Sequence, residues 1–404
     1  MDRIYLDYNA STPIAPQVLE AMMPYLTTKF GNPSSSHSFG VECRAAIEQA
    51  RERLAKLLGC EASEIIFTSG ATESNNMVIK GLAKAAGKGR HFITSQIEHP
   101  AVLEPCRHVE RFGYKVTYLP VDQYGLIDPA DLEKAITPDT ALITIMHSNN
   151  EVGTIQDIKA LAKIAASRNV PLHTDAAQSC GKVPCRVDEL GIDFLTVAGH
   201  KFYAPKGVGA LYIRKGTKLP PMLHGAGHER GMRPGTENLA SVVGLGAACE
   251  LAMPLLATEG PRQKKLGKRL LDGLKNAGLK VHLNGHPEQK LPNTWNISFE
   301  GFTAAQVMDA LGKDIAVSPG AACHGDTVNA SHVLVAMGVP TELSRGAIRF
   351  SLGRETTEAE IDHVIAALRI RLLKFDNEPQ RHRDRRQKAM IRFPSVLRDS
   401  VVQK

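Results

Sequence analysis

The stretch IIFTSGATESNN, residues 65–76, decides the fold because it joins an apolar strand to a helix through one glycine. The β-branched run before Gly70 predicts a buried strand over residues 64–69, and the residues after it predict a helix over 72–86. The first N–H groups of a helix have no partner within it, so this turn can bind a phosphate, with the Thr72 hydroxyl as a further donor. The alternative is a plain helix cap, with nearby acids in solvent.

The same strand–helix alternation continues outward from this turn. We predict further strands at residues 91–95, 115–119, 141–146, 170–175, 193–199 and 209–213, with helices at 99–112 and 157–168 among them. Alternation of this kind is typical of an α/β fold with a mainly parallel central sheet and helices on both faces.

The chain changes character after a long apolar helix predicted at residues 238–257. We predict a further helix from about 261, strands near 280–283, 294–299 and 346–352, and a terminal helix over 357–374. This pattern indicates a smaller α+β domain at the C-terminal side.

Composition limits the classes of protein to consider. The chain has 404 residues, of which 43% are hydrophobic, enough for two domains. Its seven cysteines include no CxxC pair, which argues against a disulfide framework and a common zinc site. His224 and His228 are separated by glycines rather than placed on one helix face, so we predict no metal.

The start of the chain does not resemble a signal peptide, and no apolar run approaches ~20 residues. We therefore expect a cytoplasmic protein without a membrane partner.

The C-terminal residues 376–404 are basic. They contain eight basic and four acidic residues, more than half of the formal net charge of +7. We expect a solvated tail, and the alternative is a docking arm for an acidic partner protein. Nucleic acid is disfavoured as a partner, since Phe393 is the one aromatic residue of this segment.

Two chemically distinctive residues follow predicted strands. Asp175 ends the strand VPLHTD, and Lys201 follows DFLTVAG in GHKFYAPKG. Taken singly, each also fits an ordinary role, an ion pair or a solvated lysine. Ligands of open α/β sheets bind beyond the carboxyl ends of the strands, where both residues and the Gly70 turn would meet. A phosphate turn, a buried carboxylate and a strand-end amine are what pyridoxal phosphate requires.

At this point the sequence resembles the cysteine desulfurases, close relatives of the selenocysteine lyases within the class V aminotransferases, which are fold-type I pyridoxal-phosphate enzymes. The matching stretches are YLDYNASTP, GNPSSSHSFG, IIFTSGATESNN, EHPAV, NNEVGTIQ, HTDAAQSCGK, GHKFYAPKGVGALYIR, HGAGHERGMRPGTEN, SPGAACH and AIRFSLGRETTEAEID. They extend from residue 5 to about residue 362, nearly the whole chain except the tail.

The resemblance implies roles for individual residues. Lys201 would hold the cofactor as a Schiff base, and His99 would stack on the ring and serve in proton transfer. Arg349 would bind the substrate carboxylate, and Asn150 would contact cofactor and substrate. The remaining cofactor contacts would come from Ala71, Thr72, Asp175, Gln178 and His200, and from Thr236 of the second subunit of a homodimer with shared sites.

The resemblance also implies a nucleophile, Cys323, in the small-residue segment SPGAACHGD. The attacking thiol must be accessible and deprotonated, and we expect it on a long loop from Cys323 to Val333. L-cysteine would be converted to L-alanine, with sulfur passed as a persulfide to an iron–sulfur scaffold or another thiolation acceptor. His324 remains without an assigned role.

The nearest alternatives are a selenocysteine lyase acting on L-selenocysteine and an ordinary class V aminotransferase. Many desulfurases have serine before the Gly-His-Lys triplet, where this chain has Ala198, and selenocysteine lyases also lack that serine. The loop length favours the desulfurase.

We expect four parts in the chain. These are an N-terminal segment, residues 1–15, that packs with the small domain; a large pyridoxal-phosphate domain, 16–258; a small α+β domain, 259–375, with Cys323; and the basic tail, 376–404.

Overall fold

The computed structural model describes residues 3–85, 89–320, 323–324, 327–328 and 331–376. The side chains of residues 323, 324, 327, 328 and 374–376 are not described. The predicted tail therefore lies, apart from its first residue, outside the described residues, and so does the side chain of Cys323.

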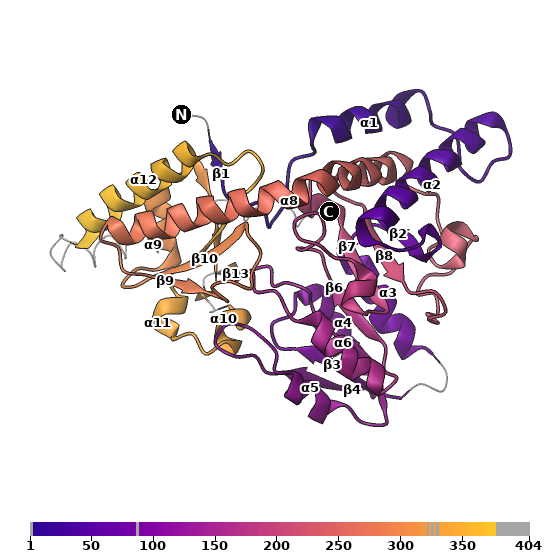
Figure 1. Ribbon diagram of the computed structural model, residues 1–404, viewed down its shortest axis with the longest axis horizontal. Coiled ribbons are helices and arrows are strands. Elements are labelled where there is room, and N and C mark those ends of the chain that lie inside the picture. Colours follow the sequence, from indigo (N-terminus) through magenta and orange to yellow (C-terminus); the bar gives the residue numbers. More distant parts are fainter. Residues whose placement is uncertain (1–2, 86–88, 321–322, 325–326, 329–330, 377–404) are drawn as a thin grey trace, which may run out of the picture.

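The central sheet has seven strands within the described residues and is mainly parallel, as predicted (Figure 1). In sheet order the strands are β2 (Ile65–Thr68), β8 (Gly209–Ile213), β7 (Phe194–Ala198), β6 (Leu172–Asp175), β5 (Thr140–Thr144), β3 (His91–Ser95) and β4 (Lys115–Leu119). β8 runs antiparallel to both of its neighbours, and the other pairs are parallel.

Helices cover both faces of this sheet because alternate strand residues are apolar on opposite sides. In β2, Ile65 and Phe67 face one buried cluster and Ile66 faces another. The first cluster includes residues of α1 (Pro16–Thr27), α2 (Ser38–Leu58), α6 (Ile158–Ser167) and α8 (Leu239–Asn276), and the second those of α3 (Ala71–Ala83) and α4 (Pro100–Glu110). Neither α1 nor α2 was predicted from the sequence.

A second, antiparallel sheet lies at the other end of the molecule. Its four strands in the described part of the chain are, in order, β12 (Ser318–Pro319), β15 (Ala347–Ser351), β10 (Thr294–Phe299) and β9 (Val281–Asn284). It shares a core with α9 (Ala304–Leu311), α12 (Glu358–Asp376) and the end of α8. β1 (Ile4–Tyr5) pairs with β11 (Ile315–Ala316), and Ile4 belongs to the same core.

Short elements complete the described chain. They are α5 (Pro129–Ala135), α7 (Val187–Leu190), α10 (His332–Ala336), α11 (Thr341–Ser344), β13 (Cys323–His324), β14 (Thr327–Val328) and the 3₁₀ helices η1 (Ala62–Glu64), η2 (Gly199–Lys201) and η3 (His228–Gly231).

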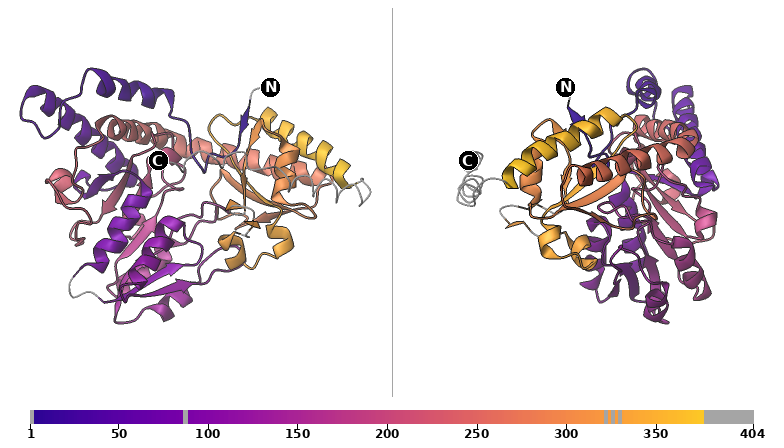
Figure 2. Two further views of the ribbon diagram at one scale, coloured as in Figure 1. Left: turned by 180° about the vertical axis from the view of Figure 1, so that it is seen from behind. Right: turned by 60° about the vertical axis from the view of Figure 1, so that its left-hand side comes forward.

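The helix α8 links the two sheets and corrects the sequence prediction. The helix predicted at 238–257 and the one predicted after 261 are one continuous helix of 38 residues, Leu239–Asn276 (Figure 2). Pro254 and Pro261, which locally favour a helix end, are both exposed. Backbone groups released by these prolines can therefore bond to water, and packing elsewhere maintains the helix. The predicted domain boundary at 258/259 falls inside α8, and the proposed domain limits remain predictions.

By length and composition, α8 is also the one helix of the described residues that could cross a membrane. Its first half, however, is packed against α1 and α2 in the larger buried cluster, with Leu245, Ala248 and Cys249 fully covered. We therefore interpret α8 as a core helix.

The segment after Cys323 differs from the predicted long loop. Cys323–His324 pairs antiparallel with Thr327–Val328, and α10 begins at His332, capped by the Ser331 hydroxyl. The loop prediction is therefore wrong for Cys323–His324 and Thr327–Val328, whose backbones pair as strands.

Candidate active site

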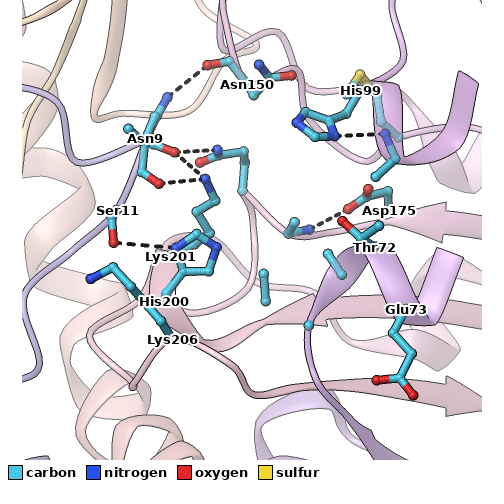
Figure 3. Close-up of a pocket in the computed structure, with 18 of the residues that line it drawn as sticks. Asn9, Ser11, Thr72, Glu73, His99, Asn150, Asp175, His200, Lys201 and Lys206 are labelled. Carbon is cyan, nitrogen blue, oxygen red and sulfur yellow. Dashed lines mark hydrogen bonds between the residues drawn. The ribbon is translucent and has the colours of Figure 1, made fainter. Parts of the chain in front are cut away.

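One cavity of about 600 Å³ lies at the carboxyl ends of β6 and β7, beside the start of α3 (Figure 3). Most of the predicted site residues line it, namely Ala71, Thr72, His99, Asn150, Asp175, Gln178, His200, Lys201 and Arg349. Figure 3 shows Lys201 and His200 on one side and Asp175 and His99 on the other. The arrangement follows from the parallel sheet, whose strand ends bring residues distant in sequence to one edge.

Asp175 ends β6 and is 6% exposed. Its Oδ2 accepts a hydrogen bond from Asn75 Nδ2 at 2.7 Å and its Oδ1 accepts one from the Ala177 N–H at 2.9 Å. The ion pairs found among the described residues do not include Asp175. A buried carboxylate without a cation is costly, so this one is suited to a protonated ring nitrogen in the cavity.

Lys201 lies in η2, directly after β7. Its Nζ donates hydrogen bonds to the carbonyl oxygens of Asn9, at 2.6 Å, and Ala10, at 3.0 Å. Burial and, next, the nearby Arg349 guanidinium lower the pKa of Lys201 to about 8, although Asp175 and Asp7 act in the opposite direction. A minor fraction of this amine is therefore neutral near physiological pH, far more than for an ordinary lysine, and a Schiff-base lysine requires this neutral form.

The start of α3 offers a phosphate site. Gly70, with φ 150°, adopts a conformation that other residues rarely adopt, and a Cβ on Gly209 would lie 2.6 Å from its Cα. Two glycines are thus needed for this close approach of turn and strand. Ala71 and Thr72, the first residues of α3, line the cavity, and Lys206 also lines it, beside His200 (Figure 3). Burial, with Lys201 and Lys206 nearby, lowers the pKa of His200 to about 4.

His99 is both a helix cap and a wall of the cavity. It is the N-cap of α4, and its Nδ1 accepts a hydrogen bond from the Ala101 N–H at 3.0 Å. In the neutral ring the proton is then on Nε2. Burial lowers the pKa of His99, with Lys201 and His332 acting in the same direction and Asp175 opposing. A neutral ring is suited to stacking on a cofactor.

Arg349 comes from β15 of the second sheet. Its Nη2 donates to Asp7 Oδ1 at 2.8 Å and to Ser318 Oγ at 3.1 Å, and its Nη1 donates to the Asn150 carbonyl at 3.0 Å. Its Nε is buried without a hydrogen-bond partner. An unpartnered donor of a cation that lines the cavity is suited to an anionic substrate group.

Two predicted residues are not placed in the cavity. Thr236 lies on an exposed segment between η3 and α8 and does not line the cavity. The side chain of Cys323 lies outside the described residues. Ala198 does line the cavity, and it offers no hydroxyl there.

Several residues that line or support the cavity were not predicted from the sequence. Asn9, Ala10 and Ser11 reach the cavity from the chain start, Lys206 from the turn before β8, and Asn75 supports Asp175. The stretches YLDYNASTP and GHKFYAPKG, which carried the resemblance, contain four of these five residues and were the available signal.

Glu73 and Glu98 are not solvated acids beside a plain helix cap, which was the alternative interpretation of the Gly70 turn. Glu73 accepts from the Ser69 N–H at 2.6 Å and pairs with Arg233 at 3.0 Å. Glu98 is fully buried, and burial raises its pKa to about 8.

The donor set fits pyridoxal phosphate. The cavity is lined by a buried carboxylate without an ion pair, by an amine with a lowered pKa, by the first residues of a helix and by a second lysine, Lys206. Within the described residues no group of three or more metal-ligating side chains was found.

Comparison with known proteins gives the same family. The aminotransferase class-V family matches residues 4–364. The chain is 51% identical over 369 residues to cysteine desulfurase IscS of Dictyoglomus turgidum, covering 90% of this chain and 93% of that protein. It is 49% identical over 364 residues to cysteine desulfurase IscS of Methanosarcina thermophila, covering 90% of each.

Solved structures agree in fold. A NifS-like protein superposes with a TM-score of 0.87 at 40% identity, covering 92% of this chain and 100% of the other. SspA in complex with cysteine superposes with a TM-score of 0.77 at 41% identity, covering 86% and 98%. The chain therefore belongs to the aminotransferase class-V family and, within it, to the cysteine desulfurases, which are pyridoxal-phosphate enzymes.

Proposed function

We propose that this chain converts L-cysteine to L-alanine and transfers the substrate sulfur to Cys323 as a persulfide. The observation that carries the proposal is the cavity in which Lys201, Asp175 and Arg349 surround one space. The 51% identity to a cysteine desulfurase over 90% of the chain supports cysteine as the substrate.

Pyridoxal phosphate, when bound, supplies an electron sink for the bond broken at the substrate α-carbon. Asp175 would keep the ring nitrogen protonated, and Gln178 would donate to the ring oxygen. His99 would stack on the ring and help transfer protons. Ala71, Thr72 and His200 would hold the phosphate.

Lys201 would remove the substrate α-proton. Since its pKa is lowered to about 8, the neutral amine that can accept this proton is present at physiological pH. Arg349 would orient the substrate by its carboxylate, with Asn150 beside it.

Cys323 would complete the reaction as a thiolate. It attacks the substrate sulfur, a sulfur–sulfur bond forms and the carbon–sulfur bond breaks. The electron pair stays with the carbon skeleton, which leaves as alanine after proton transfer.

Arg349→Lys tests the carboxylate assignment. Lysine keeps the charge but loses the planar fork and the free Nε donor. We expect KM for cysteine to rise by about 10- to 100-fold, the equivalent of a lost charge-assisted hydrogen bond. Alanine formation over a range of cysteine concentrations gives KM, and cofactor absorbance checks that the site remains intact. An unchanged KM would remove Arg349 from the substrate site.

The substrate is tested by product analysis. Purified enzyme is given L-cysteine and L-selenocysteine in parallel, and alanine is measured for each. We expect alanine from cysteine at the higher kcat/KM. A strong preference for selenocysteine would instead support the selenocysteine lyase, to which Ala198 is also suited. Amino-group transfer to a 2-oxo acid without alanine from cysteine would support the aminotransferase.

A homodimer with shared sites follows from the same proposal. Large apolar side chains are exposed on α1, on the start of α2 and between them, namely Leu19, Met23, Leu26, Phe30, Phe39 and Val41. Such a patch is typical of an interface. Thr236, exposed outside its own cavity, would then reach the phosphate of the second copy.

The sulfur acceptor would be a protein that approaches Cys323, such as an iron–sulfur scaffold or a thiolation relay. The basic residues 376–404 would either remain in solvent or contact an acidic acceptor. A cytoplasmic location is also part of the proposal.

A further inference from the structure

Lys182 lies behind the cavity and has no part in the proposed reaction. Its Nζ donates to Gln178 Oε1 at 2.9 Å and to Asn9 Oδ1 at 3.1 Å. With Lys201 it lines a small second cavity of about 20 Å³. A lysine at this position contacts two residues that themselves line the active-site cavity.

These contacts determine which way two amides are turned. A charged lysine ammonium only donates, so Gln178 presents its oxygen to Lys182 and is left with its NH₂ group to donate. One of these two N–H groups bonds to the Asn9 carbonyl at 2.9 Å. The second is free to donate into the cavity, where the ring oxygen of the cofactor would lie.

The Asn9 amide is fixed by the same lysine. Its Oδ1 accepts from Lys182 and, at 2.9 Å, from Asn293 Nδ2. Its Nδ2 donates to the Asn150 carbonyl at 3.2 Å and to Thr294 Oγ1 at 2.8 Å. Lys182 thus belongs to a network in which every amide has one satisfied orientation.

This geometry does not depend on the charge of the lysine. Burial, together with Lys201 and Arg349, lowers the pKa of Lys182 well below its usual value. A neutral amine keeps two N–H donors for Gln178 Oε1 and Asn9 Oδ1. Its lone pair could accept from a turned Gln178 amide, but turning would place Gln178 Oε1 against the Asn9 carbonyl, which accepts from Gln178 Nε2. The orientation of Gln178 is therefore the same for the neutral and the charged amine.

We propose that Lys182 is a positioning residue that holds the Gln178 amide with its NH₂ group toward the ring oxygen of the cofactor. The inference rests on the proposed function, since it assumes pyridoxal phosphate in the cavity. Donation to the oxygen reduces its attraction for the proton on the neighbouring lysine–cofactor nitrogen. Without Lys182 the amide keeps only its bond to the Asn9 carbonyl. It is then held less firmly with its NH₂ group toward the oxygen, and the proton on the lysine–cofactor nitrogen is held to a higher pH.

The test is a pH titration of the visible absorbance of the holoenzyme. We expect Lys182→Met to raise the midpoint pH by about 0.5 to 1 unit, the scale of one hydrogen bond. Gln178→Leu should raise it in the same direction, and the double variant should show no further shift. The matched control is Lys163→Met, an exposed position on α6, which should keep the wild-type midpoint.

The result that overturns the proposal is an unchanged midpoint in a folded, cofactor-loaded Lys182 variant, or additive shifts in the double variant. If Lys182→Met does not fold, Lys182→Gln replaces it, since its shorter side chain cannot reach both acceptors and should shift the midpoint less but in the same direction. Alanine formation by the wild-type enzyme is measured separately. A wild-type enzyme that forms no alanine would refute the proposed function. The midpoint pH of the absorbance titration needs only bound cofactor, so it tests the role of Lys182 separately.

Discussion

Lys201→Ala is expected to lack the visible absorption band of a lysine-bound cofactor. It should also form alanine about 100- to 10,000-fold more slowly than the wild type. The band requires a covalent bond to an amine at the end of η2, and no amine remains there. The slow turnover follows because the proton-accepting group is also lost, and general-base catalysis contributes on this scale.

The measurement for Lys201→Ala is an absorption spectrum of the purified protein after incubation with pyridoxal phosphate, together with alanine formation from cysteine. Lys206→Ala is the matched control, because Lys206 is a second lysine that lines the same cavity. This control should weaken cofactor binding but keep the band at saturating cofactor. A Lys201→Ala spectrum identical to that of the wild type would refute the Schiff-base assignment.

The wild-type reaction should also depend on pH in a defined direction. Because the pKa of Lys201 is lowered to about 8, the neutral amine increases as pH rises through 8 and disappears as pH falls below it. Proton removal in a single turnover should therefore accelerate with pH across this window, until other groups limit the rate.

Cys323→Ser is expected to separate cofactor chemistry from sulfur transfer. The cofactor band and its change on adding cysteine should persist, because Lys201, Asp175 and Arg349 are unaltered. Persulfide and sulfide formation should fall by on the order of 1,000-fold or more, as expected for loss of a nucleophile. Serine is close to cysteine in size but does not form a comparable nucleophile at neutral pH.

The matched control for Cys323→Ser is Cys60→Ser. Cys60 is the one partly exposed thiol among the cysteines whose side chains are described, and burial raises its pKa. It should therefore be inert, and its replacement should leave sulfur transfer unchanged. Wild-type rates in Cys323→Ser would mean that another group accepts the sulfur.

Local sequence patterns predicted the central sheet well. The predicted ranges of β3, β4 and β8 coincide with those of the structure, because apolar, β-branched runs bounded by turn residues are strong local signals. The continuity of α8 could not be predicted, since Pro254 and Pro261 locally favour a break and only their exposed positions explain why it does not occur.

The site was predictable where a residue follows a strand and was missed where contacts are distant in sequence. Asp175 ends a strand, and Lys201 and Thr72 come soon after strands. Asn9, in contrast, bonds to Lys201 and to Asn293, and apart from the family resemblance of YLDYNASTP nothing in the sequence indicates that the chain start reaches this cavity. The burial of Glu98 is likewise set by its partners Ser95 and Met146, of which the latter is 48 residues away.

The most direct test of the central claim follows the sulfur atom. Wild-type holoenzyme without an acceptor is given one equivalent of sulfur-labelled L-cysteine, and alanine and labelled peptides are quantified after one turnover. We predict one alanine per active site and one labelled sulfur on the peptide that contains Cys323. Alanine formed with no label on Cys323, or label on another cysteine, would contradict the account.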